Sequence, residues 1–220
     1  MWPVQETQVL PDSCLVEWDC FVQTVTLDCT YFEIYQRGGQ TRNIIVTEYL
    51  TLDGVFEEPG YWSFDYFNEE AMQYKRDELF SSDVQLLGRV TYEGFAKAWP
   101  TMPDTGDFGE RMNSMPKYVV STTLTHAEWQ NTTIINKNVV EVIKKLKEQA
   151  GQHILVAGSG KLVHTLMQHH LVDEYRFMVH PVVLGSGKRL FPEGTEQYKL
   201  KLVETRAFKT GIVVLHYQPV

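Results

Sequence analysis

The strongest constraint on the fold is an alternation of short apolar segments with longer amphipathic ones. Residues 154–157 (Ile-Leu-Val-Ala) carry only apolar side chains, and residues 138–149 place valines, isoleucine and leucine on one helical face with lysines opposite. Strands covered by helices on both faces have such continuous apolar sequences, whereas strands with one solvated face alternate. The pattern therefore predicts an α/β domain with a mostly parallel sheet that is covered on both faces.

The predicted elements follow one another without an internal repeat. Strands are expected at 43–50, 84–87, 118–120, 154–157 and 174–181, and helices at 68–80, 91–98, 138–149 and 161–169. In the first helix Asn68 suits the N-cap, and Met72, Leu79 and Phe80 fit an apolar face. Residues 201–208 and 212–217 flank a Lys-Thr-Gly turn, which predicts a terminal hairpin that adds antiparallel strands at one edge.

The first 41 residues differ in composition from the rest of the chain. They contain all three cysteines, and six acidic residues against one basic residue. The cysteines form no CxxC pair and the segment has no histidine, so the spacing fits neither a zinc site nor a disulfide framework. We interpret residues 1–41 as an N-terminal extension without identifiable chemistry, in which 22–27 is compatible with a strand, joined to a separate α/β domain at 42–220.

Composition also restricts the partners. The net charge of −8 disfavours a surface that tracks nucleic-acid phosphates. No stretch approaches the roughly 18–20 apolar residues that span a bilayer, and no secretory signal is readable, so a cytoplasmic location is expected by default. The histidines lack the spacing of a metal site, and we predict no metal.

Two Gly-Ser-Gly-Lys sequences, at 158–161 and 185–188, superficially resemble phosphate loops. Neither has the upstream glycine or the following Ser or Thr of a nucleoside-triphosphate loop, and the first lacks the third glycine of the dinucleotide fingerprint. Gly158-Ser159-Gly160 nevertheless lies between a predicted strand and a predicted helix. Glycines there let a diphosphate approach the backbone, and the N–H groups of the helix start favour its charge. A tight turn without a ligand is the alternative.

Two further groups of polar residues follow predicted strands. Gly88-Arg89-Val90-Thr91 offers a guanidinium for a phosphate and a threonine that can cap the next helix; the alternative is a capped helix with a solvated arginine. Ser121 and Thr122 follow the strand at 118–120, where an adenosine ribose or phosphate would fit; the alternative is ordinary turn chemistry.

The order of these motifs resembles that of the dihydrofolate reductases. The matching pieces are Ile44-Ile45-Val46 with Leu52-Asp53-Gly54, residues 86–93 (Leu-Leu-Gly-Arg-Val-Thr-Tyr-Glu), 117–121, 154–160 and 173–177. The resemblance is closer to the reductase domain of the bifunctional riboflavin-biosynthesis enzymes, the RibD C-terminal domain, and its small stand-alone relatives. Residues 180–191 (His-Pro-Val-Val-Leu-Gly-Ser-Gly-Lys-Arg-Leu-Phe) look like the signature of that subgroup.

This resemblance covers residues 42–219 and implies both a fold and a cofactor. The implied fold is a dihydrofolate-reductase-like three-layer α/β sandwich with a mostly parallel central sheet and antiparallel C-terminal hairpin strands. The implied cofactor is NADPH, with the loop at 53–56 flanking its nicotinamide. The residues that would contact its phosphates and adenosine are Gly88, Arg89, Thr91, Ser121, Thr122, Gly158, Ser159, Gly160, Lys161 and Leu162.

The chain departs from the folate reductases at the acid that holds their pterin. That acid lies on the inner face of the first helix, about sixteen residues before the Gly of Gly-Arg-x-Thr, and counting back from Gly88 gives Met72. An insertion would bring Glu70 into register, although Glu70 also suits the helix start. Asp53, in the Leu-Asp-Gly sequence, is the better polar candidate. We therefore name Asp53 and Glu70 as candidate catalytic residues and disfavour folate as the substrate.

The segment between Asp53 and Gln73 has no Lys or Arg but many acidic and aromatic residues, which suits a neutral or cationic planar ring better than a phosphate. The aromatic residues are equally compatible with a role in the core or in dimer contacts. We predict an NADPH-dependent oxidoreductase, resembling 5-amino-6-(5-phosphoribosylamino)uracil reductase, that transfers hydride to a small pyrimidinone- or pterin-like heterocycle and forms a homodimer. The alternative is a non-catalytic nucleotide-binding or dimeric scaffold protein of the same fold, because no proton donor is obvious.

Overall fold

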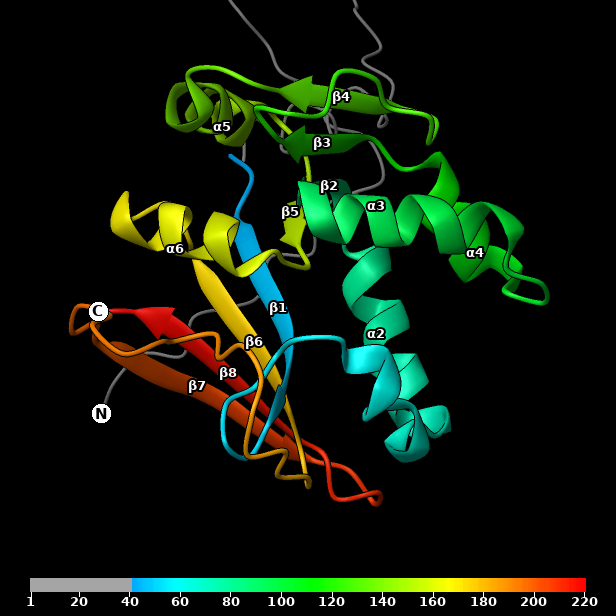
Figure 1. Ribbon diagram of the computed structural model, residues 1–220, viewed down its shortest axis with the longest axis vertical. Coiled ribbons are helices and arrows are strands. Elements are labelled where there is room, and N and C mark those ends of the chain that lie inside the picture. The colour runs from blue at the N-terminus through cyan, green and yellow to red at the C-terminus, as the bar shows by residue number, and fades with distance from the viewer. Residues whose placement is uncertain (1–40) are drawn as a thin grey trace, which may run out of the picture. The chain divides into compact units, whose positions relative to one another are not determined.

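The predicted alternation of strands and helices is present in the computed structural model, which describes residues 41–220 (Figure 1). The strands are β1 (Ile44–Thr51), β2 (Ser82–Gly88), β3 (Lys117–Val120), β4 (Thr132–Ile135), β5 (His153–Val156), β6 (Glu174–His180), β7 (Leu200–Ala207) and β8 (Val213–Pro219). The α-helices are α2 (Glu69–Phe80), α3 (Arg89–Ala98), α4 (Gly106–Ser114), α5 (Val139–Glu148) and α6 (Gly160–Gln168). Short 3-10 helices span Pro59–Tyr61, Phe64–Tyr66 and Trp99–Thr101.

The eight strands of residues 41–220 form a single sheet in the order β4-β3-β2-β5-β1-β6-β8-β7. The neighbours from β4 to β6 are parallel, whereas β8 runs antiparallel to β6 and β7 runs antiparallel to β8. The structure thereby confirms the predicted mostly parallel sheet with antiparallel C-terminal strands. Strand β1 lies between β5 and β6, and all of its residues except Tyr49 are buried, as expected for a strand covered on both faces.

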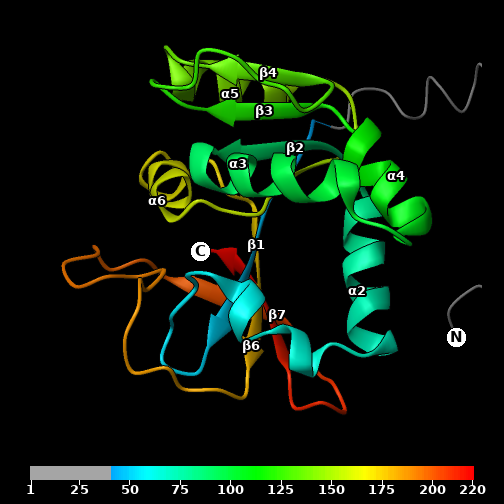
Figure 2. The same cartoon turned by 45° about the vertical axis from the view of Figure 1, so that its right-hand side comes forward.

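The sheet separates two layers of helices (Figure 2). Successive side chains of each strand point to opposite faces, so a strand contributes to the core on both sides of the sheet. On one face Val46 and Leu50 of β1 pack with apolar residues of α5 and α6. On the other face Ile45 packs with Leu79 of α2 and with residues of α3 and α4. The result is the predicted three-layer α/β/α sandwich.

Helix α2 confirms one prediction about its ends and corrects one about its faces. The side chain of Asn68 accepts a hydrogen bond from the N–H of Ala71 at 3.0 Å and so caps the helix as expected. The predicted apolar face was wrong in part, since Met72 is 63% exposed and Phe80 is 39% exposed. The buried face instead carries Ala71, Glu78 and Leu79.

Other local predictions also need correction. Thr91 does not cap α3, because that helix already begins at Arg89 with Gly88 at the N-cap. Helix α4 and strand β4 were not predicted; α4 is a short segment with two glycines, a residue that weakens a helix signal. The predicted extension at 1–41 lies outside the described residues apart from Thr41. None of the helices between residues 41 and 220 is long and apolar enough to cross a membrane.

Candidate functional site

The N-termini of α3 and α6 meet at the carboxyl ends of two neighbouring strands. Strands β2 and β5 are parallel and adjacent, and each leads directly into one of these helices. The N–H of Gly88 donates a hydrogen bond to the carbonyl of Gly158 at 3.1 Å, which joins the two helix starts. Neither helix has a side-chain cap. Their first N–H groups are therefore available to an anion, and both helix dipoles favour negative charge at this point.

Glycines are required where these segments approach each other. A Cβ atom built on Gly88 would lie 2.9 Å from both the backbone N and the Cβ of Ser159, and one on Gly160 would lie 2.7 Å from the ring of Phe56. Gly158 has a φ of +89°, which disfavours any other residue. Phe56 belongs to the loop that follows β1, so the structure brings the predicted 53–56 loop against the Gly158–Gly160 turn.

The other predicted cofactor residues on these helices have different surroundings. The hydroxyl of Thr91 lies 2.8 Å from the position of a Cβ on Gly158, so Thr91 faces the turn. Arg89 instead forms a surface ion pair with Glu93 on its own helix, at 2.8 Å. Leu162 is buried in the core and Lys161 is exposed.

Ser121 and Thr122 lie at the same edge of the sheet, since Val120 is the register partner of Gly88. Ser121 is buried, and its hydroxyl accepts hydrogen bonds from the N–H groups of Thr123 (3.2 Å) and Leu124 (2.9 Å). These hydrogen bonds are typical of a turn, which was the alternative to an adenosine contact in the sequence analysis. Thr122 is exposed.

The carboxylate of Asp53 is hydrogen-bonded to two separate segments of the chain. Its carboxylate accepts hydrogen bonds from the hydroxyl of Thr51 (2.6 Å) and from the N–H groups of Gly185 (2.8 Å) and Leu184 (3.3 Å). The Thr51 hydroxyl and these backbone donors lower the pKa of Asp53 to about 2. Asp53 is therefore ionised at neutral pH and fixes the loop after β6, an arrangement that gives it no proton to donate.

Replacing Asp53 with Asn should loosen that loop. The amide retains one acceptor oxygen but removes the charge that strengthens two backbone hydrogen bonds, so amide exchange in residues 182–190 should accelerate at pH 7. Because the folded-state pKa lies below the usual Asp value, the ionised contacts persist in the native protein down to about pH 3 and weaken as the pH falls through about 2. Hydrogen-exchange mass spectrometry checks this, with Asp65→Asn, an exposed acid, as the control. Unchanged exchange in this loop would contradict the assigned role.

Glu70, the second candidate acid, makes contacts with the terminal hairpin. Its Oε2 accepts a hydrogen bond from the N–H of Lys209 at 3.2 Å, and its Oε1 lies 3.8 Å from the guanidinium of Arg206. Glu70 thus connects the start of α2 with β7 and the turn that follows it, whereas Asp53 holds the loop after β6.

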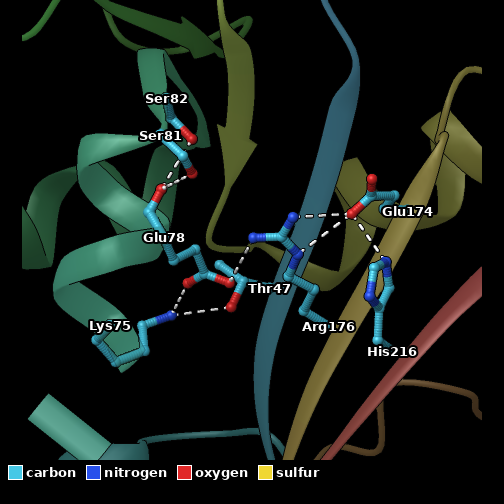
Figure 3. Close-up of polar contacts among 8 residues, drawn as sticks. All are labelled: Thr47, Lys75, Glu78, Ser81, Ser82, Glu174, Arg176 and His216. Atoms are coloured by element: carbon cyan, nitrogen blue, oxygen red, sulfur yellow. Dashed lines mark hydrogen bonds and ion pairs between the residues drawn. The ribbon is translucent and has the colours of Figure 1, made fainter. Parts of the chain in front are cut away.

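A buried polar network, which the sequence analysis missed, lies between α2 and the sheet (Figure 3). Lys75 pairs with Glu78 and donates to the hydroxyl of Thr47 at 2.9 Å. Arg176 of β6 approaches Glu78 at 3.9 Å. Glu78 is the inner-face acid of α2, since its side chain is only 1% exposed. The register count had pointed to Met72, six residues nearer the start of the helix.

The network continues across the antiparallel strands. Glu174 accepts a hydrogen bond from Arg176 at 2.9 Å and lies 2.8 Å from Nε2 of His216 on β8 (Figure 3). A small cavity of about 150 Å³ adjoins it, lined by Tyr74, Arg176, Glu204, Arg206, Val214 and His216. A larger open depression of about 560 Å³ lies beside α4 and contains none of the predicted site residues.

Several aromatic residues of the segment after Asp53 surround a buried histidine. The rings of Trp62, Tyr66 and Phe67 lie 5.2, 6.0 and 6.2 Å from the ring of His180. Burial lowers the pKa of His180, and its Nδ1 lies 2.9 Å from the carbonyl of Met178. These aromatic residues support the end of β6, whereas Tyr61 and Phe64 are exposed.

A second group missed by the sequence analysis is the carboxyl of Glu48, in the middle of β1. Glu48 is only 8% exposed, and its Oε1 has no hydrogen-bond partner among residues 41–220. A Cβ on Gly158 would lie 3.6 Å from Oε1 and 3.9 Å from Oε2, so the carboxyl faces the turn. Burial raises the pKa of Glu48 to about 8 although Lys75 acts to lower it, and the carboxyl is protonated at neutral pH. A lone acid in a covered strand was the sequence signal for it.

Comparisons with known proteins identify the family of this chain. The model of the RibD C-terminal domain family matches residues 42–214. The chain belongs to the RibD C-terminal domain family. The YyaP protein of Bacillus subtilis (strain 168) is 35% identical over 179 residues, which cover 80% of this chain and 94% of YyaP.

Comparison with solved structures shows that the chain has a reductase-type fold. A Shewanella sp. PV-4 protein described as a riboflavin biosynthesis protein is 19% identical with a TM-score of 0.66, covering 81% of this chain and 99% of that one. Dihydrofolate reductase from Enterococcus faecalis, solved with NADP(H), is 14% identical with a TM-score of 0.55, covering 80% of this chain and 96% of that one.

The signature-like segment at 180–191 has a clear structural role in this RibD C-terminal domain. It pairs with the loop after β1: Val55 forms a bridge with Arg189, and the N–H of Phe56 donates to the carbonyl of Lys188 at 3.0 Å. The N–H of Leu190 in turn donates to the carbonyl of Gly54 at 3.1 Å. The segment therefore positions the loop that carries Phe56 against the Gly158–Gly160 turn.

Proposed function

We propose that this domain is an NADPH-dependent reductase of a small planar heterocycle, with the cofactor's diphosphate at the junction of α3 and α6. The observation that carries the proposal is the pair of uncapped helix N-termini joined by the hydrogen bond from Gly88 to Gly158. Two helix dipoles and free N–H groups at one point suit a diphosphate, and the glycines leave room for its close approach. The Enterococcus faecalis reductase, solved with NADP(H), has the same fold.

The residues present fit this cofactor. The backbone around Gly88, Gly158 and Gly160 would hold the diphosphate, and Thr91 would contact it from α3. The cofactor supplies a hydride when bound. The chain's own part is to hold and orient the cofactor and to exclude water from the reacting rings.

The acceptor is proposed to be a neutral or cationic ring of pyrimidinone or pterin type. No Lys or Arg occurs between Asp53 and Gln73, and Lys188, which reaches this region, is already paired with Glu57. A phosphorylated acceptor would therefore find few free cations in this loop. A non-catalytic nucleotide-binding protein is the second candidate, because Asp53 and Glu70 are both engaged with the chain itself.

Isothermal titration with NADPH and NADH tests the proposal. We expect NADPH to bind in the micromolar range or tighter, a binding free energy of about −8 kcal/mol or better. Absence of micromolar binding to either nucleotide would overturn it. Oxidation of bound NADPH by at least one member of a panel of pterins, pyrimidinones and quinones is then expected, and binding without any oxidation would favour the non-catalytic candidate.

A further inference from the structure

The carboxyl of Glu48 lies directly against the proposed cofactor site. It points from β1 toward Gly158, on the same face of the sheet as α6, and it is more than nine-tenths buried. The neighbouring residue Thr47 points to the opposite face, where it contacts Lys75 of the polar network. The alternation of β1 therefore assigns Glu48 to the cofactor side of the strand and Thr47 to the α2 side.

Packing alone gives no reason for an acid at this position. The other residues of β1 on this face, Val46 and Leu50, belong to the apolar core. Oε1 of Glu48 is enclosed without a hydrogen-bond partner in the described part of the chain. Buried polar atoms are almost always hydrogen-bonded in native proteins, so an enclosed carboxyl oxygen without a partner indicates a ligand that provides one.

We propose that Glu48 binds the carboxamide of the nicotinamide ring, accepting a hydrogen bond from its NH₂ group and donating one to its carbonyl oxygen. This inference rests on the proposed function. A protonated carboxyl presents one donor and one acceptor side by side, which is the complement of a primary amide. The neutral form also adds no negative charge beside a site that must take an anionic cofactor.

The groups around Glu48 determine the pH at which its carboxyl ionises and therefore how cofactor binding depends on pH. Lys75 of α2 is the charged group that acts on it, and Thr91 of α3 and the turn at Gly158 present uncharged groups. The other neighbours of Glu48 on this side of the sheet are apolar. They include Leu162 and Val163 of α6, Val156 of β5 and Phe177 of β6. As the pH rises through about 8 the carboxyl ionises, loses its donor and brings a negative charge toward the cofactor. Binding should therefore weaken at alkaline pH.

The experiment compares two ligands and two variants by titration calorimetry at pH 7 and pH 9. NADPH contains the carboxamide, and 2′-phospho-ADP-ribose has the same phosphates and adenosine without the nicotinamide. For the wild-type protein, NADPH affinity should fall roughly tenfold between the two pH values, because about nine-tenths of a group with a pKa near 8 is ionised at pH 9. The affinity for 2′-phospho-ADP-ribose should change by less than about threefold.

Glu48→Gln is the matched variant, since its amide keeps one donor and one acceptor but does not ionise. It should bind NADPH at pH 7 within a few-fold of wild type and lose the fall at pH 9. Glu48→Leu removes both groups and should bind NADPH about tenfold more weakly at pH 7, while binding 2′-phospho-ADP-ribose as wild type does.

Two results would overturn the inference while leaving the proposed function intact. One is an equal fall in NADPH affinity in wild type and Glu48→Gln. The other is a fall for 2′-phospho-ADP-ribose as large as that for NADPH, which would place the effect at the phosphates. If wild-type protein binds neither ligand at pH 7, the proposed function and this inference fail together. The comparison of the two ligands on wild-type protein decides the matter even where a variant does not fold.

Discussion

Replacing Glu78 with alanine is expected to lower the free energy of unfolding by about 3–5 kcal/mol, the usual cost of breaking a buried ion pair from one side. The Glu78 side chain is 1% exposed, and its removal leaves the ammonium of Lys75 buried without its carboxylate. Arg176 also loses its 3.9 Å contact with the Glu78 carboxylate. Urea denaturation followed by circular dichroism at pH 7 measures the change.

The exposed pair of Arg89 and Glu93 provides the control for Glu78. Both of its side chains are more than 40% exposed, so Glu93→Ala should cost about 0.5 kcal/mol or less. The double variant Lys75→Met/Glu78→Leu removes both charges and should recover most of the stability that Glu78→Ala loses. A loss below about 1 kcal/mol for Glu78→Ala would show that the buried pair does not hold α2 on the sheet.

Replacing Gly88 with alanine is expected to weaken NADPH binding roughly 10- to 100-fold, equivalent to the ~1–3 kcal/mol that overpacking usually costs. The backbone of Gly88 has a φ of −77°, which alanine adopts without strain. The effect would arise from the added methyl group, which would lie 2.9 Å from the backbone N of Ser159 and push the two helix N-termini apart. Titration calorimetry with NADPH at pH 7 measures it.

Gly94 is a matched control on the same helix. A Cβ added to Gly94 meets nothing within 4 Å, so Gly94→Ala should leave NADPH binding unchanged and stabilise α3 by about 0.5–1 kcal/mol. Unchanged NADPH affinity in a folded Gly88→Ala protein would remove the junction of α3 and α6 from the binding site.

The sequence predicted those parts of the fold whose signals are local. Asn68 capped its helix as expected, and the apolar run at 154–157 became a central strand, because capping and strand burial depend on neighbouring residues. The start of helix α3 was predicted two residues too late, at Thr91 instead of Arg89. Gly88 ends the strand and occupies the N-cap position without a side-chain hydrogen bond, so no capping side chain marked the helix start. Helix α4 was missed because its two glycines weaken the helix signal, and packing of Met112 in the core stabilises the helix in the folded domain.

The sequence predicted only those parts of the candidate site whose motifs directly follow a recognisable strand. Gly88 and Gly158 were expected to act together, and the structure joins them by a hydrogen bond. The partners of Asp53 lie 131 and 132 residues further along the chain, a distance at which no local pattern identifies a contact. Glu48 was missed for a different reason: its strand was recognised, but its role depends on a turn more than a hundred residues away.

The position of β1 has a consequence for how the domain folds. In register it pairs Ile44 with Ile154 on one side and Ile45 with Glu174 on the other, so both neighbours come from the second half of the chain. The entropy of closing such long loops must be overcome before the centre of the sheet can form, which slows folding relative to a helical bundle of similar size. Until then the apolar side chains of β1 remain open to intermolecular association.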